Sequence, residues 1–107
     1  MNFLEPYLPD IQRLCDEFQV AELHAFGSVL TDRFSADSDV DLLVQFQVLP
    51  PLSYIDHYFG LKFALEELLQ REVDLLETQA VRNKVLQASI DASKKVIYEQ
   101  GSPSLVS

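Results

Sequence analysis

Three stretches of the chain alternate apolar and polar residues in the manner of β-strands: Val20 to Phe26, Asp39 to Phe46 and Arg71 to Glu77. Because successive side chains of a strand point to opposite faces, the second stretch places one set of residues toward a core and another set away from it. The core set is Val40, Leu42, Val44 and Phe46, and the opposite set is Asp39, Asp41, Leu43 and Gln45. In the first stretch the same rule groups Ala21 with Leu23 and Ala25.

Apolar residues spaced three and four apart predict helices between these strands. They run from about Pro9 to Phe18, from about Tyr54 to Gln70 with Ser53 as its cap, and from Val81 or Asn83 to Glu99. A short helix is also expected from Ser28 to Arg33. This order of elements predicts an α/β (α+β) fold, a small mixed sheet of about three strands packed with helices, and leaves the strand order open.

The candidate chemistry lies between Gly27 and Asp41, where two strands meet a loop. Asp39 and Asp41 project from the same face of their strand, and two carboxylates side by side need a positive partner, typically a hard divalent cation such as Mg²⁺. Gly27 lets backbone approach a ligand closely, and Ser28 offers a hydroxyl and an amide. The pattern therefore predicts a site for a metal-bound nucleotide.

Composition narrows the possibilities further. A chain of 107 residues predicts a single domain, 1–107, with its core at about 10–99 and a flexible tail at 100–107. The net charge of −9 argues against binding to a nucleic-acid polymer, which needs clustered Lys and Arg. The single cysteine, Cys15, suits a helix core and a reducing compartment, and no apolar run is long enough for a membrane span. We expect a cytoplasmic protein.

The spacing of Gly27-Ser28, ten residues, then Asp39-Val40-Asp41 resembles the signature of the DNA polymerase β-like nucleotidyltransferase superfamily. The short chain, the leading helix, the REVDLLE strand and a helix ending near VIYEQ resemble the minimal nucleotidyltransferases, or MNT proteins. The resemblance implies a nucleotidyltransferase fold in which Asp39 and Asp41 hold Mg²⁺ and Gly27 and Ser28 bind nucleotide phosphates. Asp74, an isolated acid in an apolar strand, would be the third carboxylate, which helps to bind the metal and accepts the proton of the attacking hydroxyl.

The same resemblance implies an activity and a partner. Many such proteins are antitoxins of HEPN-domain proteins, and members transfer AMP from ATP to a tyrosine of that toxin. One departure matters: many relatives carry Arg-Ala-Arg-Gly after Gly-Ser, and here Val29-Leu30-Thr31-Asp32 stands in its place. Arg33 or a partner protein would have to supply the missing positive charge.

Two functions therefore remain open. The first is a Mg²⁺-dependent, ATP-using nucleotidyltransferase that modifies a protein hydroxyl, and the second is a non-catalytic binding module that neutralises its partner by contact. Tyr54, Tyr58 and Phe59 are expected in the core or on the surface of a homodimer. The acceptor, the preferred base and the oligomeric state do not follow from the sequence.

Overall fold

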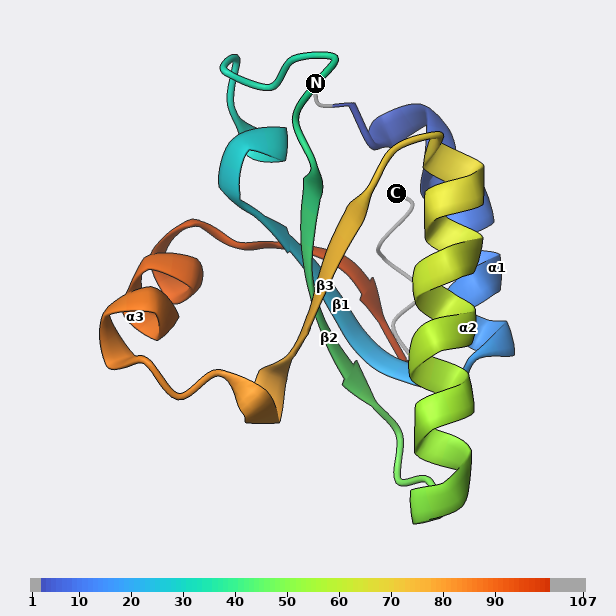
Figure 1. The fold of residues 1–107 in the computed structure, drawn as a ribbon. Coiled ribbons are helices and arrows are strands. Elements are labelled where there is room, and N and C mark those ends of the chain that lie inside the picture. Colours follow the sequence, from blue (N-terminus) through green and yellow to red (C-terminus); the bar gives the residue numbers. More distant parts are fainter. Residues whose placement is uncertain (1–2, 101–107) are drawn as a thin grey trace.

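A four-stranded sheet separates the helices into two layers in the computed structural model, which describes residues 3–100. Helices α1 (Leu8–Glu17) and α2 (Pro51–Leu69) lie on one side, and α3 (Lys84–Ser93) lies on the other (Figure 1). The strands are β1 (Val20–Phe26), β2 (Val40–Phe46), β3 (Val73–Glu77) and β4 (Lys95–Glu99), in the order β3-β2-β1-β4. β2 and β3 run parallel, and β1 is antiparallel to both of its neighbours, β2 and β4.

Three short 3-10 helices complete the described chain. They are η1 (Glu5–Tyr7), η2 (Gly27–Leu30) and η3 (Thr78–Ala80). The short helix expected from Ser28 to Arg33 is therefore the single 3-10 turn η2, which ends before Arg33. No helix of the described residues is long and apolar enough to cross a membrane.

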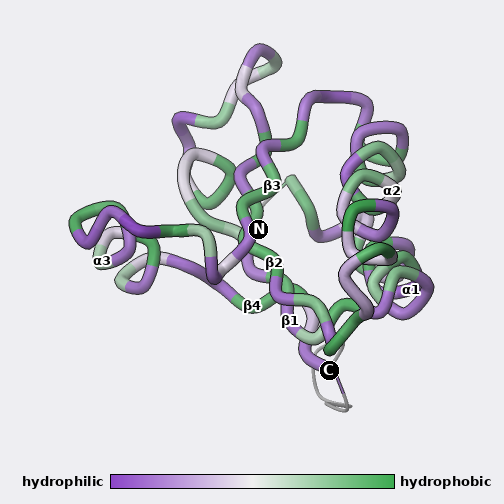
Figure 2. The backbone as a smooth tube through the Cα atoms, turned by 60° about the horizontal axis from the view of Figure 1, so that its bottom comes forward, coloured by the Kyte–Doolittle hydropathy of each residue, from purple (hydrophilic) through white to green (hydrophobic). Residues whose placement is uncertain are grey.

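The main core lies between the sheet and the α1/α2 layer. The alternation predicted for β2 is confirmed, because Val40, Leu42 and Val44 belong to this core and Leu43 does not. In Figure 2 hydrophobic and hydrophilic residues alternate along the central strands. The face predicted for Ala21 is wrong: the register of β1 against β2 shifts between Val20 and Glu22, and this irregularity places Val20 rather than Ala21 in the core with Leu23 and Ala25.

Helix α2 begins without the cap expected at Ser53. Its N-cap is Pro50 and its first residue is Pro51, a position where proline fits because its fixed φ matches the helix and no N–H is needed there. The helix ends at Leu69, and its C-cap residue Gln70 has a left-handed φ of 55°. Gly60 allows α2 to lie against the ring of Phe18, since a Cβ there would be 2.5 Å from Phe18 Cε1.

The prediction of one closing helix to Glu99 is wrong, because the helix α3 ends at Ser93 and residues 95–99 form β4. Val96, Ile97 and Tyr98 are β-branched or aromatic residues that favour a strand, and the free edge of β1 offers them backbone hydrogen bonds. The Tyr98 hydroxyl also donates to the carboxylate of Asp16 in α1. The sheet therefore has four strands rather than about three, and residues 101–107 of the predicted tail lie outside the described residues.

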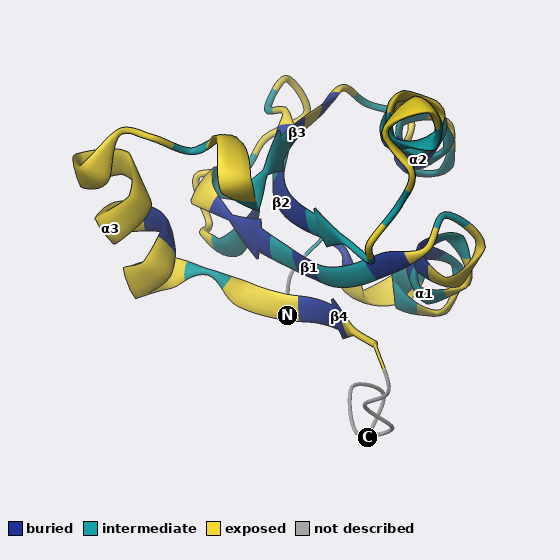
Figure 3. Cartoon of the chain, turned by 90° about the horizontal axis from the view of Figure 1, so that it is seen from below, coloured by how far each residue is buried: buried dark blue, intermediate teal, exposed yellow. Residues whose placement is uncertain are grey.

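A second, much smaller core lies on the opposite face of the sheet. Its buried members are Phe26, Leu43 and Ile90, with Leu76 and Val81 packed beside them. Figure 3 shows that α3 is exposed along almost its whole length except where it meets this cluster. This face is thus only partly buried, and Asp41 and Asp74 lie on it.

Candidate active site

Two of the three predicted carboxylates lie on adjacent strands at the same level. The parallel register of β2 and β3 pairs Asp41 with Asp74, so their side chains project from the same face of the sheet. This is the face covered in part by α3, because Leu43 and Leu76, two residues further along each strand, belong to the small cluster under α3. The structure therefore brings Asp74, 33 positions later in the sequence, next to Asp41.

Gly27 lies directly beneath the Asp41 carboxylate. Its φ of +77° is left-handed, and a Cβ atom built on it would lie 2.5 Å from Asp41 Oδ2. Any other residue would be strained and would also displace the carboxylate. The backbone of the Gly-Ser turn and an acidic side chain are thus in direct contact, as a site that joins phosphate binding to a metal requires.

Asp39 lies immediately before β2 and is exposed, at the end of a loop that is tied down by Arg71. Arg71 Nη1 donates two hydrogen bonds of 2.9 Å, to the carbonyl oxygens of Ser35 and Ser38. The guanidinium also lies between two aromatic rings, 4.4 Å from the centroid of Phe3 and 4.5 Å from that of Phe34. Arg71 was not predicted as a site residue, and its only signal in the sequence is a cation at the start of the predicted third strand.

The electrostatics of this face are unbalanced. Burial raises the pKa of Asp41, and the nearby charges of Asp74 and Asp39 raise it further. No ion pair of the described residues involves any of the three carboxylates. Within residues 3–100, however, no three acidic, histidine or cysteine side chains already converge as a metal site. The oxygen donors and the Gly27 cradle fit a hard divalent cation, and binding it would require the exposed carboxylates of Asp39 and Asp74 to turn toward Asp41.

A hollow of about 480 Å³ begins at the Gly-Ser turn. It is lined by backbone and polar groups together with two cations: Gly27, Ser28, Leu30, Thr31, Arg33, Ser93 and Lys95. The loop here is held by Thr31, whose hydroxyl donates to the carbonyl oxygen of Ser28 (3.0 Å) and accepts from the Arg33 amide (3.2 Å). Arg33 therefore lies beside Gly27 and Ser28. Lys95 was missed from the sequence because it was assigned to the closing helix.

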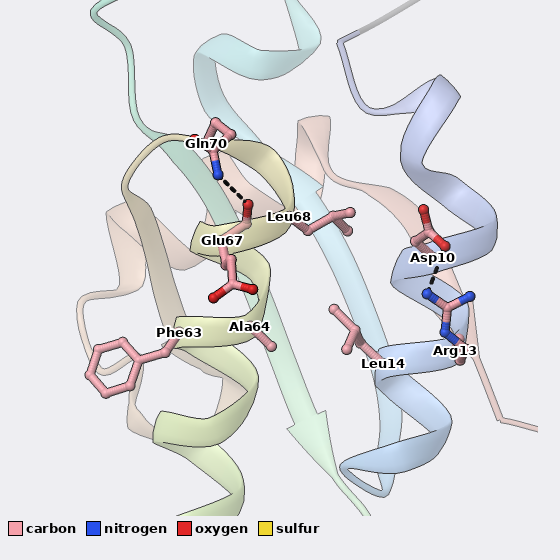
Figure 4. Close-up of a pocket in the computed structure, with 8 residues that line it drawn as sticks. All are labelled: Asp10, Arg13, Leu14, Phe63, Ala64, Glu67, Leu68 and Gln70. Carbon is pink, nitrogen blue, oxygen red and sulfur yellow. Dashed lines mark hydrogen bonds and ion pairs between the residues drawn. The ribbon is translucent and has the colours of Figure 1, made fainter.

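A larger hollow of about 600 Å³ lies elsewhere, in the groove between α1 and α2 (Figure 4). Its polar groups are largely paired with one another: Arg13 contacts Asp10 at 2.8 Å, and Gln70 Nε2 donates to the carbonyl oxygen of Glu67 at 2.7 Å. The groove is on the α1/α2 side of the sheet, and the carboxylates of β2 and β3 are on the α3 side. Its cation, Arg13, is neutralised by Asp10, and its remaining charge, Glu67, is negative, so the groove is poorly suited to a nucleotide.

Known proteins resemble this chain over most of its length. The family model described as the nucleotidyltransferase domain matches residues 11–100. The protein adenylyltransferase MntA of Thermococcus cleftensis is 31% identical over 87 residues, which cover 81% of this chain and 82% of that protein.

Solved structures share the fold. One assigned as a minimal nucleotidyltransferase has a TM-score of 0.73 at 28% identity, covering 89% of this chain and 95% of the other. A chain from the complex of a tri-AMPylated HEPN toxin of Shewanella oneidensis with an MNT antitoxin has a TM-score of 0.61 at 18% identity. That match covers 90% of this chain and 72% of the other, and it supports the fold alone.

Proposed function

Since the chain belongs to the nucleotidyltransferase-domain family, as a minimal nucleotidyltransferase, we propose that it transfers AMP from ATP to a hydroxyl group of a protein acceptor. The observation that carries this proposal is the contact of Asp41 with Gly27, together with Asp74 in register on the next strand. This arrangement joins a phosphate-binding turn to a group of carboxylates on an open face of the sheet.

We assign a role to each residue of the site. Asp39, Asp41 and Asp74 would hold Mg²⁺, which when bound supplies positive charge to neutralise the triphosphate. Asp74 would also accept the proton of the acceptor hydroxyl as the hydroxyl oxygen bonds to the α-phosphorus. The bond from that phosphorus to the β-phosphate bridging oxygen breaks, and pyrophosphate leaves with the electron pair. Alignment of the two reactants and charge stabilisation account for most of the expected rate.

The nucleotide would enter with its phosphates at the Gly-Ser turn. Gly27 and Ser28 line the adjoining hollow, and Arg33 adds a cation there. Two relatives support ATP as the donor: MntA of Thermococcus cleftensis is named as an adenylyltransferase, and a toxin–antitoxin complex that shares this fold was crystallised with AMP-PNP.

The acceptor we propose is a HEPN-domain toxin, for which this chain would act as the antitoxin. The support is the shared fold with MNT and MntA chains from such toxin–antitoxin complexes. This role would place the protein in the cytoplasm, where ATP is available and where the free thiol of buried Cys15 stays reduced.

A second candidate function is neutralisation of the same partner by contact alone. The observation in its favour is the loop after Ser28, where Val29 is 2% exposed and packs in the main core instead of presenting a basic residue to a nucleotide. Such a protein would keep the fold and the binding surface and lose the chemistry.

Labelling distinguishes the two functions. The protein is incubated with Mg²⁺, α-³²P-ATP and the HEPN protein encoded beside it, in parallel with the double variant Asp39→Asn/Asp41→Asn. The transferase function predicts label on the HEPN protein with the wild-type chain only. If the HEPN protein acquires no label yet both forms neutralise its toxicity equally, the contact function is correct.

A further inference from the structure

The basic residues of this acidic chain fall into two groups. Four of the eight are engaged: Arg13, Lys62 and Lys94 form ion pairs, and Arg71 bonds to carbonyl oxygens. The other four form no ion pair with the described residues; these are Arg33, Arg82, Lys84 and Lys95. Two of these uncommitted cations, Arg33 and Lys95, line the same hollow beside Gly27 and Ser28.

We propose that Lys95 binds the triphosphate of the nucleotide and supplies, with Arg33, the positive charge that the loop after Ser28 lacks. The inference rests on the proposed nucleotide site and deepens it. The register of β4 pairs Lys95 with Ala25, two residues before Gly27, so the lysine enters the hollow from the neighbouring strand instead of from the loop. Its side chain is exposed, and a lysine ammonium on a flexible stem suits phosphate oxygens.

The charge balance of the chain favours such a residue. The net charge of −9 repels a polyphosphate, and a local cation beside the Gly-Ser turn reduces this repulsion where the phosphates would lie. Lys94, the adjacent lysine, is not available in the same way, since its Nζ lies 3.1 Å from Asp91 Oδ1. Of these two adjacent lysines, Lys94 is therefore paired with an acid, and Lys95, the first residue of β4, forms no ion pair with the described residues.

The experiment is isothermal titration of the wild-type chain and three variants with Mg·ATP and with AMP. The variants are Lys95→Ala, Lys95→Arg and Lys84→Ala. Lys84→Ala removes the same charge from an exposed, uncommitted lysine of α3 that does not line the hollow. Loss of a charged hydrogen bond predicts that Lys95→Ala weakens Mg·ATP binding by about 10-fold or more. AMP affinity should stay unchanged, Lys95→Arg should keep most of the affinity, and Lys84→Ala should match the wild type.

Each other result has a distinct meaning. If Lys95→Ala binds Mg·ATP as tightly as the wild type, or if Lys84→Ala weakens binding equally, the inference is overturned. If the wild type itself does not bind Mg·ATP, the nucleotide site is wrong and the failure belongs to the proposed function. Thermal melts verify that each variant is folded, and Lys95→Gln, which keeps most of the stem, replaces Lys95→Ala if that variant melts early.

Discussion

The two faces of the sheet differ in how completely they are covered. One face packs against α1 and α2 and contains most of the buried residues, from Ile11 and Cys15 of α1 to Leu61, Leu65 and Leu69 of α2. On the other face Phe26 and Leu43 of the strands are buried against Ile90 of α3, and beside them the strands carry Asp41 and Asp74. Both faces belong to the same strands, and alternate residues along β2 serve one face or the other.

The face covered by α1 and α2 therefore stabilises the fold, and the partly covered face carries the candidate site. Carboxylates are rarely tolerated in a packed core, so a site built from them needs a face that is only partly covered. The raised pKa of Asp41 reflects its position at the margin of the small cluster, half-buried and close to two other acids. Substitutions on the face covered by α1 and α2 should therefore lower stability more than activity. Substitutions of the site residues should lower activity more than stability.

The largest effect is expected for Asp41→Asn. Loss of a carboxylate at the centre of the site should reduce AMP transfer by about 10²–10³-fold, while the variant remains folded. The measurement is labelling of the HEPN partner with α-³²P-ATP. Asp37→Asn is the matched control, because Asp37 is an exposed aspartate of the loop between η2 and β2 and its replacement changes the net charge equally. Equal labelling by the two variants would show that the open face is not the site.

Next in size is the loss of stability on the covered face. Leu65 is fully buried between α2 and the sheet, so Leu65→Ala should lower the free energy of unfolding by about 2–5 kcal/mol. Ile90→Ala, on the side of α3 that faces the sheet, should cost about 2 kcal/mol or less, since half-buried neighbours of Ile90 can move into the space. Urea unfolding followed by circular dichroism gives both values. A greater cost for Ile90→Ala would reverse the roles assigned to the two faces.

The two glycines provide a third, intermediate comparison. Gly27→Ala would place a Cβ 2.5 Å from Asp41 Oδ2 at a left-handed φ, and the displaced carboxylate should reduce transfer by up to about 10²-fold. Gly60→Ala meets the ring of Phe18 on the covered face, so it should change stability and leave the activity per folded molecule unchanged. Steady-state transfer rates and melting curves of both variants test this. A Gly27→Ala protein with wild-type activity would show that the close packing of Gly27 against the Asp41 carboxylate is not required for transfer.

The smallest effect concerns pH. Because the pKa of Asp41 is raised above its ordinary value of 3.8 in the folded protein, folding favours the protonated form. The ionised carboxylate therefore lowers stability as pH rises from about that value through the folded pKa. At pH 7 without metal, Asp41→Asn should melt slightly higher than the wild type, and the difference should vanish in acid. Mg²⁺ should raise the melting temperature of the wild type more than that of the variant.

The Asp37→Asn variant serves again as the control for net charge in this series of melts. If it gains as much stability as Asp41→Asn at pH 7, the gain comes from overall charge and not from the crowding of Asp41 by Asp39 and Asp74.

Local pattern was sufficient to predict part of this arrangement. The three strands β1, β2 and β3, the side of β2 that carries Asp41, and the burial of Cys15 follow from alternation and helical spacing. Asp74 was assigned to the site through the resemblance and because it is an isolated acid in the next predicted strand. Its exact register opposite Asp41 was not predicted, since strand order and register do not follow from local pattern.

Other features depend on tertiary contacts that no local pattern contains. Residues 95–99 become a strand because β1 has a free edge, and that choice brings Lys95 to the Gly-Ser turn. The irregularity at Ala21 and the position of Arg71 against the loop before Asp39 also depend on tertiary contacts. Arg71 bonds to carbonyl oxygens more than thirty positions away, a separation that sequence spacing does not encode.

The metal-dependent nucleotide site can be tested by isothermal titration of ATP into the wild-type chain and the Asp39→Asn/Asp41→Asn variant, with Mg²⁺ and with EDTA. We expect that the wild type binds ATP with Mg²⁺, that EDTA abolishes or strongly weakens this binding, and that the variant does not respond to Mg²⁺. Binding of equal strength in EDTA, or a variant that responds to Mg²⁺ as the wild type does, would contradict the claim that the open face of the sheet is a metal-dependent nucleotide site.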